Sequence, residues 1–190
     1  MARAAALLPG LHERARAAEE SRRLSDDTVR EFRAAEFHKI PPILVGMANG
    51  MAEAVRRTLI GKKALFSGEL QVERVANQMK LIEALTDIHA AELIMRHRLT
   101  ELMRWGEAGA PPSTLDALSS QRDASYVSRL MGKVANNLAL MSGATSINLS
   151  NPIQRYQRDI NAGVTHVSLV WEEAAENYGR ALWELPGKAR

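Results

Sequence analysis

The chain contains no cysteine, which excludes disulfide bonds, zinc sites built from thiolates and cysteine nucleophiles. Aromatic residues make up only 5% of the 190 residues, so a core has to be built mainly from aliphatic side chains and methionine. This composition favours packed helices, because small and unbranched side chains let helix axes approach closely. The N-terminal apolar run is too short for a signal peptide, and charges interrupt every apolar run before it reaches the length of a membrane span. A soluble cytoplasmic protein without a membrane segment is therefore expected.

Charge of one sign is concentrated nowhere in the chain. The 25 lysines and arginines and the 22 aspartates and glutamates are interspersed and give a formal net charge of +3. Nucleic-acid-binding proteins usually carry a concentrated basic patch, so no nucleic-acid partner is predicted. The sequence has no P-loop, dinucleotide fingerprint, nucleophile elbow or His-Glu-x-x-His motif. His89 and Glu92 have no counterpart on a second predicted helix, and no metal site is predicted.

Apolar residues recur at spacings of three and four along most of the chain, and the period-two alternation of a strand persists nowhere. The pattern predicts an all-α fold, an up-down bundle of long antiparallel helices. Long helices are expected over about 43–66, 69–105, 113–142 and 152–183. On the first of them, Gly46 and Gly50 share a face and permit close contact with another helix. The second carries an apolar stripe that is expected to be buried and comprises Val72, Val75, Met79, Ile82, Leu85, Ile88, Ile94, Leu99 and Leu102.

Two adjacent prolines mark the predicted boundary between domains. Pro41 and Pro42 end the second of two short N-terminal helices, because proline disfavours helical geometry in the residue before it. The predicted organisation is an N-terminal helical pair with its Pro-Pro junction, residues 1–42, followed by a helical bundle domain, residues 43–190.

A dense set of polar residues follows a helix-start signal near the end of the chain. Asn151 is suited to cap a helix whose first residue is Pro152, because proline lacks only an N–H that the first turn leaves unpaired. From that start, Arg155, Asp159 and His166 follow at i, i+4 and i+11, which places them on one face of an unbroken helix. Such a row suits acid–base chemistry or ligand binding, and it equally suits a structural row of salt bridges.

This part of the sequence resembles the C-terminal helical domain of the acyl-CoA dehydrogenase superfamily, and within it the two-component flavin-dependent monooxygenases. The residues that carry the resemblance are Asn-Pro-Ile-Gln-Arg-Tyr-Gln-Arg-Asp at 151–159, followed by Ala162, His166 and Trp171. The similarity extends over residues 43–186 and, more weakly, over residues 7–37.

The resemblance implies that His166 faces a flavin and a substrate. It would be the catalytic residue, acting as a base toward a substrate hydroxyl group or as a hydrogen-bond donor to a flavin-bound oxygen species. Imidazole suits both roles because its unperturbed pKa is about 6.5. Arg155, Arg158 and Asp159 would bind the cofactor, FAD or FMN, since a guanidinium group pairs with phosphate through two hydrogen bonds. A surface histidine and an ion pair within the helix are the structural alternatives for His166 and Asp159.

Members of the superfamily also contain a β-rich middle domain, which this sequence lacks between residues 38 and 43. The flavin of the family lies between that domain and the helical one, so an exposed apolar patch and self-association are expected. The resemblance implies a homo-oligomer, a dimer or tetramer, and a flavin reductase as a further partner.

The sequence leaves two functions to be decided between. One is a flavin-dependent monooxygenase that acts on a small organic substrate with reduced flavin and oxygen, and the other is a non-catalytic helical oligomerisation module that has lost the flavin site.

Overall fold

The computed structural model describes residues 40–109 and 112–187, together with residues 17, 20 and 21. Contacts divide the chain into two units, Met1–Ile40 and Pro41–Arg190, and nearly all of the described residues belong to the second unit. The two predicted N-terminal helices lie almost wholly outside the described residues. The predicted organisation into two domains therefore stays a prediction.

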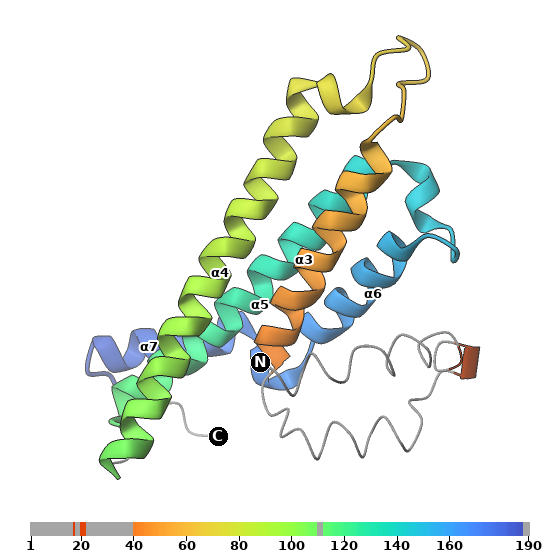
Figure 1. Cartoon of the computed structure of the whole chain (residues 1–190). Helices are drawn as coiled ribbons and strands as arrows, with labels where there is room; N and C mark the ends of the chain where they lie inside the picture. The colour runs from red at the N-terminus through yellow and green to blue at the C-terminus, as the bar shows by residue number, and fades with distance from the viewer. Residues whose placement is uncertain (1–16, 18–19, 22–39, 110–111, 188–190) are drawn as a thin grey trace. The chain divides into compact units, whose positions relative to one another are not determined.

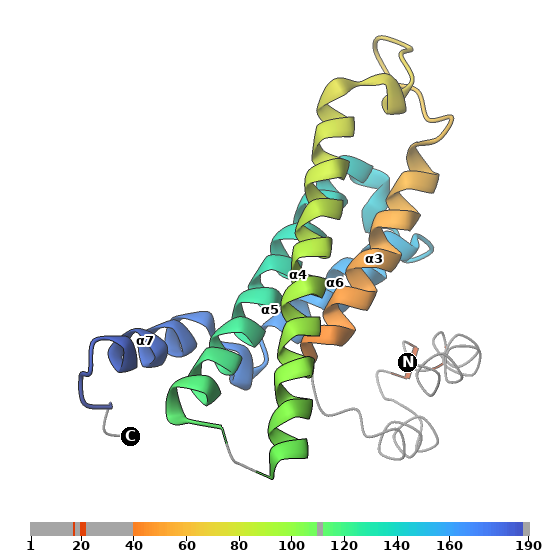
Figure 2. The ribbon, with the colours of Figure 1, turned by 60° about the vertical axis from the view of Figure 1, so that its left-hand side comes forward.

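Four helices of the second unit, α3 to α6, run alternately up and down, and a fifth, α7, lies to one side of them (Figure 1). Figure 2 shows α7 projecting from the lower part of α5. The α-helices are α3 (Ile40–Leu59), α4 (Val75–Ala108), α5 (Thr114–Ser142), α6 (Pro152–Val164) and α7 (Trp171–Leu182), and the short 3₁₀ helices are η1 (Gln71–Glu73), η2 (Ala144–Ile147) and η3 (Val167–Leu169). α5 is central, because it packs against α4, α6 and α7.

The predicted all-α, up-down bundle is confirmed. Residues 40–109 and 112–187 contain no β-strand, and the one bridge found in these ranges joins Lys63 to Leu70. None of the helices in the described part of the chain is long and apolar enough to cross a membrane.

Side-chain caps fix the first residues of two helices. The Asp116 backbone N–H donates a hydrogen bond to the Ser113 hydroxyl oxygen at 3.2 Å, and the Ser113 N–H donates one to the Asp116 carboxylate at 3.2 Å. This reciprocal pair is a capping box, and it satisfies two orphan donors at the start of α5. At α6, the Ile153 N–H donates to Asn151 Oδ1 at 3.0 Å, and Pro152 is the first helical residue. Both predicted helix starts are confirmed.

The helix α3 differs from its prediction at both ends. It begins at Ile40, so that Pro41 and Pro42 lie in its first turn, where a missing N–H leaves no helical hydrogen bond unmade. It ends at Leu59 and does not continue to residue 66. The chain turns there because Gly61 adopts a positive φ of 77°, which a residue with a side chain rarely does.

The core consists of aliphatic and methionine side chains, as the composition predicts. Its most deeply buried large side chains come from α3 (Leu44, Met51, Val55), α4 (Ile88), α5 (Val127, Met131, Val134, Leu138) and α6 (Ile153, Ile160). α5 supplies more of them than any other helix because it lies between α4 and α6. The chain's interior is therefore organised around α5.

The apolar stripe of α4 is mostly exposed, and the prediction that it is buried is wrong. Val75, Met79 and Ile82 expose 66%, 68% and 60% of their surface, and Leu99 exposes 48%. Ile88 alone among the largest buried side chains comes from this stripe. Periodicity identifies the apolar side of a helix but not the element that covers it. The rest of the described chain covers this side of α4 at Ile88 and leaves most of the stripe open.

Candidate functional site

The segment that carries the predicted site residues forms two helices, and the prediction of one continuous helix is wrong. α6 ends at Val164, and α7 begins at Trp171. Just beyond the end of α6, the Thr165 hydroxyl group donates a hydrogen bond to the Ala162 carbonyl oxygen at 2.8 Å. Local bonds of this kind compete with the hydrogen bonds of a helix, and β-branched residues lower helix propensity.

His166 lies in this break, where it caps η3 and does not continue α6. The Ser168 backbone N–H donates to His166 Nδ1 at 3.2 Å, and Ser168 Oγ lies 2.8 Å from the same nitrogen. The imidazole side chain is exposed. His166 therefore shares no helix face with Arg155 and Asp159, and the predicted row of three is wrong. Its catalytic role stays a prediction.

The three predicted cofactor-binding residues all lie on α6. Arg158 and Asp159 form an ion pair, with 2.9 Å between Nε and Oδ1, and their side chains are 44% and 42% exposed. Arg155 lies one turn before Asp159 and is half-buried. An ion pair within the helix is the structural alternative for Asp159, and α6 contains that pair. The binding roles of the three residues stay predictions.

Side-chain amides hold α6 on α5. Asn136 of α5 accepts hydrogen bonds at its Oδ1 from Gln157 at 3.1 Å and from Asn161 at 3.2 Å. The Asn136 amide nitrogen donates in return to Asn161 Oδ1 at 3.3 Å. At the C-terminal end of α6, the Val164 side chain would lie 3.4 Å from a Cβ added at Gly132. This close approach fixes the end of α6, immediately before the break.

Aromatic and cationic contacts hold the start of α7 on the other side of the break. The ring centroids of Trp171 and Tyr126 are 5.4 Å apart and the rings are tilted by 58°. The Arg129 guanidinium carbon lies 5.7 Å from the Trp171 centroid, within the range of a cation–π contact. Both partners belong to α5, so α5 holds the break at both of its ends.

The contact of Ser168 with His166 is not predicted from the sequence. A signal is nevertheless present, because the polar side chains of Thr165, His166 and Ser168 stand among the β-branched Val164 and Val167. Such a cluster favours local side-chain bonds over a continuing helix.

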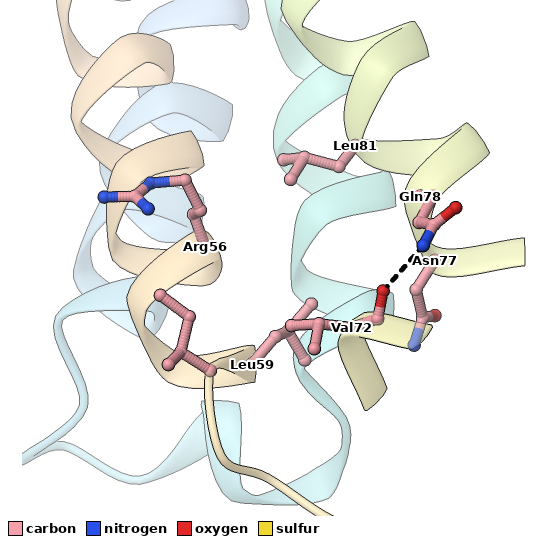
Figure 3. Close-up of a pocket in the computed structure, with 7 residues that line it drawn as sticks. Arg56, Leu59, Val72, Asn77, Gln78 and Leu81 are labelled. Atoms are coloured by element: carbon pink, nitrogen blue, oxygen red, sulfur yellow. Dashed lines mark hydrogen bonds between the residues drawn. The ribbon is translucent and has the colours of Figure 1, made fainter. Parts of the chain in front are cut away.

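A separate hollow of about 120 Å³ lies between the end of α3, η1 and the first turns of α4 (Figure 3). Leu59, Val72 and Leu81 give it a mostly apolar lining, and Gln78 Nε2 donates a hydrogen bond to the Val72 carbonyl oxygen at 2.9 Å. It is smaller than the roughly 300 Å³ at which ligand pockets usually begin. The helix ends that line it, the end of α3 and the start of α4, lie at the opposite end of the bundle from the C-terminus of α6 (Figure 1), so the hollow is not part of the site around His166.

Comparison with known proteins identifies the family. The model of the family described as the acyl-CoA dehydrogenase C-terminal domain matches residues 40–171. The pigment production hydroxylase of Rhodococcus sp. is 28% identical over 148 residues, which cover 78% of this chain and 38% of that protein. The oxygenase component of the FADH₂-dependent resorcinol hydroxylase of Rhizobium sp. is 27% identical over 117 residues, which cover 62% of this chain and 28% of that protein. The chain thus spans less than two fifths of the length of either relative.

A solved structure agrees with this match. The 3-HSA hydroxylase from Rhodococcus sp. RHA1 superposes with a TM-score of 0.70 at 28% identity, over 79% of this chain and 39% of that one. The described residues hold the helical part of the family fold and no middle β domain. The predicted resemblance is confirmed. The match to the family model covers more than two thirds of this chain, and the chain therefore belongs to the acyl-CoA dehydrogenase C-terminal domain family.

Proposed function

We propose that the chain acts as a flavin-dependent monooxygenase, hydroxylating a small organic substrate with reduced flavin and oxygen. The observation that carries the proposal is the placement of His166. Its exposed imidazole is held at a break that follows the Arg-Asp pair, within the segment that the family model matches. The two relatives at 28% and 27% identity, which are hydroxylases, support the same chemistry.

The residues present fit one side of a flavin site. The exposed Arg158 guanidinium supplies hydrogen-bond donors for an anionic group, and Asp159 orients it through the 2.9 Å ion pair. Arg155 brings a second guanidinium one turn earlier on α6. His166 is the group that would contact the reacting atoms. A bound reduced flavin supplies the electrons with which molecular oxygen is activated.

The cofactor and the partner follow from the same relatives. FAD is proposed in preference to FMN because the resorcinol hydroxylase is FADH₂-dependent. A separate flavin reductase is proposed as a partner because that relative is an oxygenase component. The site of the reaction in the cell is proposed to be the cytoplasm, where the sequence predicts the protein.

Anaerobic titration of the full chain with FADH₂, and in parallel with reduced FMN, tests the proposal. Saturable binding is expected, weakened at least tenfold in Arg158→Met because one charge-assisted contact is lost. The matched control is Arg104→Met, since Arg104 is also exposed and pairs with its helix neighbour Glu101 at 2.9 Å. Mixing the complex with oxygen should then give a reoxidation rate that changes in His166→Ala. No saturable binding at high micromolar flavin, by a chain that retains its helical circular dichroism, would contradict the monooxygenase.

The exposed apolar stripe of α4 supports a second candidate, a non-catalytic helical oligomerisation module. A stripe of this kind on a soluble helix marks an interaction surface. Either function is compatible with a homo-oligomer, and the stripe is proposed as its contact. We expect wild-type chain to be a dimer or tetramer in sedimentation experiments.

The double substitution Met79→Glu with Ile82→Glu is expected to raise the dissociation constant of that oligomer more than tenfold. The reason is that each carboxylate would have to be desolvated at the contact. Leu140→Glu is the matched control, because Leu140 is 78% exposed but belongs to α5. An oligomer that tolerates the double substitution as well as the control would exclude the α4 stripe as the contact.

A further inference from the structure

We infer that Ser168 is a positioning residue that fixes the His166 imidazole as a hydrogen-bond donor at Nε2. The inference deepens the proposed function and rests on it for the catalytic consequence. The protonation of the ring, by contrast, is a property of this chain alone and is measured without any cofactor.

The backbone hydrogen bond to His166 Nδ1 determines which nitrogen carries the proton, and the hydroxyl contact is compatible with that assignment. A backbone N–H can only donate, so the 3.2 Å bond from the Ser168 N–H requires a lone pair on Nδ1. Ser168 Oγ lies 2.8 Å from the same nitrogen, and its hydroxyl group can turn its hydrogen toward that lone pair. In a neutral imidazole one nitrogen is protonated and the other is not. The proton of neutral His166 is therefore on Nε2.

The backbone around Ser168 keeps these donors in place. Ser168 is the middle residue of η3, whose start is closed by a hydrogen bond from the Leu169 N–H to the His166 carbonyl oxygen at 2.8 Å. The Leu169 side chain is buried, and η3 packs against α5. On the other side, the His166 N–H donates to the Gly163 carbonyl oxygen at 3.2 Å. The histidine and the serine that clamps it are thus both anchored to the bundle.

The contacts from Ser168 to His166 Nδ1 select between the two roles that the sequence leaves open for His166, general base and hydrogen-bond donor. With the lone pair directed at Ser168, the exposed Nε2 presents an N–H and has no lone pair with which to take a proton. Moving the proton to Nδ1 would break the hydrogen bond from the Ser168 N–H and would oblige Ser168 Oγ to accept where it now donates. Neutral His166 is therefore suited to donate a hydrogen bond to an oxygen atom of the substrate or the flavin, and unsuited to act there as a general base.

Nitrogen NMR of the full chain labelled with ¹⁵N-histidine tests the inference without a cofactor. The spectrum is recorded on the basic plateau of the imidazole titration, where the ring signals no longer change with pH and the ring is neutral. For His166 we expect Nδ1 to resonate in the unprotonated range and Nε2 in the protonated range. In Ser168→Ala the hydroxyl donor is lost while the backbone N–H still donates to Nδ1, so the separation of the two shifts should narrow without disappearing. Ser168→Thr, which keeps the hydroxyl group, should restore their separation.

His97 serves as an internal reference in the same spectra, since it is exposed on α4 and far along the chain from Ser168. Its shifts should not respond to either substitution. A protonated Nδ1 in the wild-type chain would overturn the inference. Unchanged His166 shifts in Ser168→Ala, with helical circular dichroism retained, would overturn the role of the serine. Loss of flavin binding would leave the tautomer result standing, so failure of the proposed function is distinguishable from failure of this inference.

If hydroxylation is established, Ser168→Ala should lower its rate at unchanged flavin affinity, and Ser168→Thr should restore the rate.

Discussion

Replacing Asp123 with asparagine is expected to lower the free energy of unfolding by about 3 kcal/mol, because it removes the shared partner of two arginines. Asp123 Oδ2 accepts a hydrogen bond from Arg98 Nε, and Asp123 Oδ1 accepts from Arg122. The side chains of Arg98 and Asp123 are only 14% and 15% exposed. Arg122 also lies 4.2 Å above the ring of Tyr178, so the cluster joins α4, α5 and α7. Asparagine keeps the size of the side chain but leaves both guanidinium groups without their counter-charge.

Denaturant unfolding followed by helical circular dichroism measures this effect, with all variants at one protein concentration because an oligomer makes the midpoint concentration-dependent. The matched control is Glu101→Gln, which removes the ion pair to Arg104. Arg104 is 70% exposed, so the loss of Glu101 as its partner should lower the free energy of unfolding by less than about 0.5 kcal/mol. Equal effects of the two substitutions would contradict the argument that burial makes the Asp123 cluster important. Adding Arg98→Met to Asp123→Asn should cost little more, because the more deeply buried of the two uncompensated charges is then removed.

The features that the sequence predicts correctly depend on short-range chemistry. The capping serine of α5 acts on a residue three positions later, and Asn151 acts on a residue two positions later. Neither bond needs information about the rest of the fold, so the pattern of residue types is sufficient. The fold class is predictable for a related reason. The spacing of apolar residues is a property of each helix, and that spacing indicates helices throughout.

The features that the sequence does not predict depend on which parts of the fold come into contact and on where a helix ends. The stripe of α4 has the period of a buried face, yet what covers it is decided by partners that the described chain does not supply. The predicted row from Arg155 to His166 extrapolates one helix over eleven residues. It fails because side-chain bonds near Thr165 and Ser168 end α6. The family resemblance does not fail with the row, since its motif is local in the sequence and the family model matches residues 40–171 whatever the course of the helix.

Substituting alanine for Gly46 and for Gly50 is expected to change stability in opposite directions, although the two glycines lie one turn apart on α3. A Cβ at Gly50 would lie 2.7 Å from the Tyr156 hydroxyl oxygen and 2.9 Å from its Cζ, which is closer than atoms can pack. A Cβ at Gly46 would meet no atom of the described residues within 4 Å. Among those residues, Gly50 has the close helix contact that the sequence predicts for both glycines, and Gly46 does not. Gly46→Ala should stabilise by about 1 kcal/mol through helix propensity. Gly50→Ala should destabilise by about 1–2 kcal/mol, because the clash outweighs the same gain.

A third substitution separates the clash from any other property of position 50. In a Tyr156→Leu background the ring end is gone, so Gly50→Ala should become stabilising by about 1 kcal/mol, as at Gly46. The measurement is again denaturant unfolding at one protein concentration. If Gly50→Ala stabilises the wild-type chain as much as Gly46→Ala does, then α3 and α6 have room to separate at this point. α6 would in that case be located mainly by its amide contacts to Asn136 and by Val164, and the break that holds His166 would depend on α5 alone.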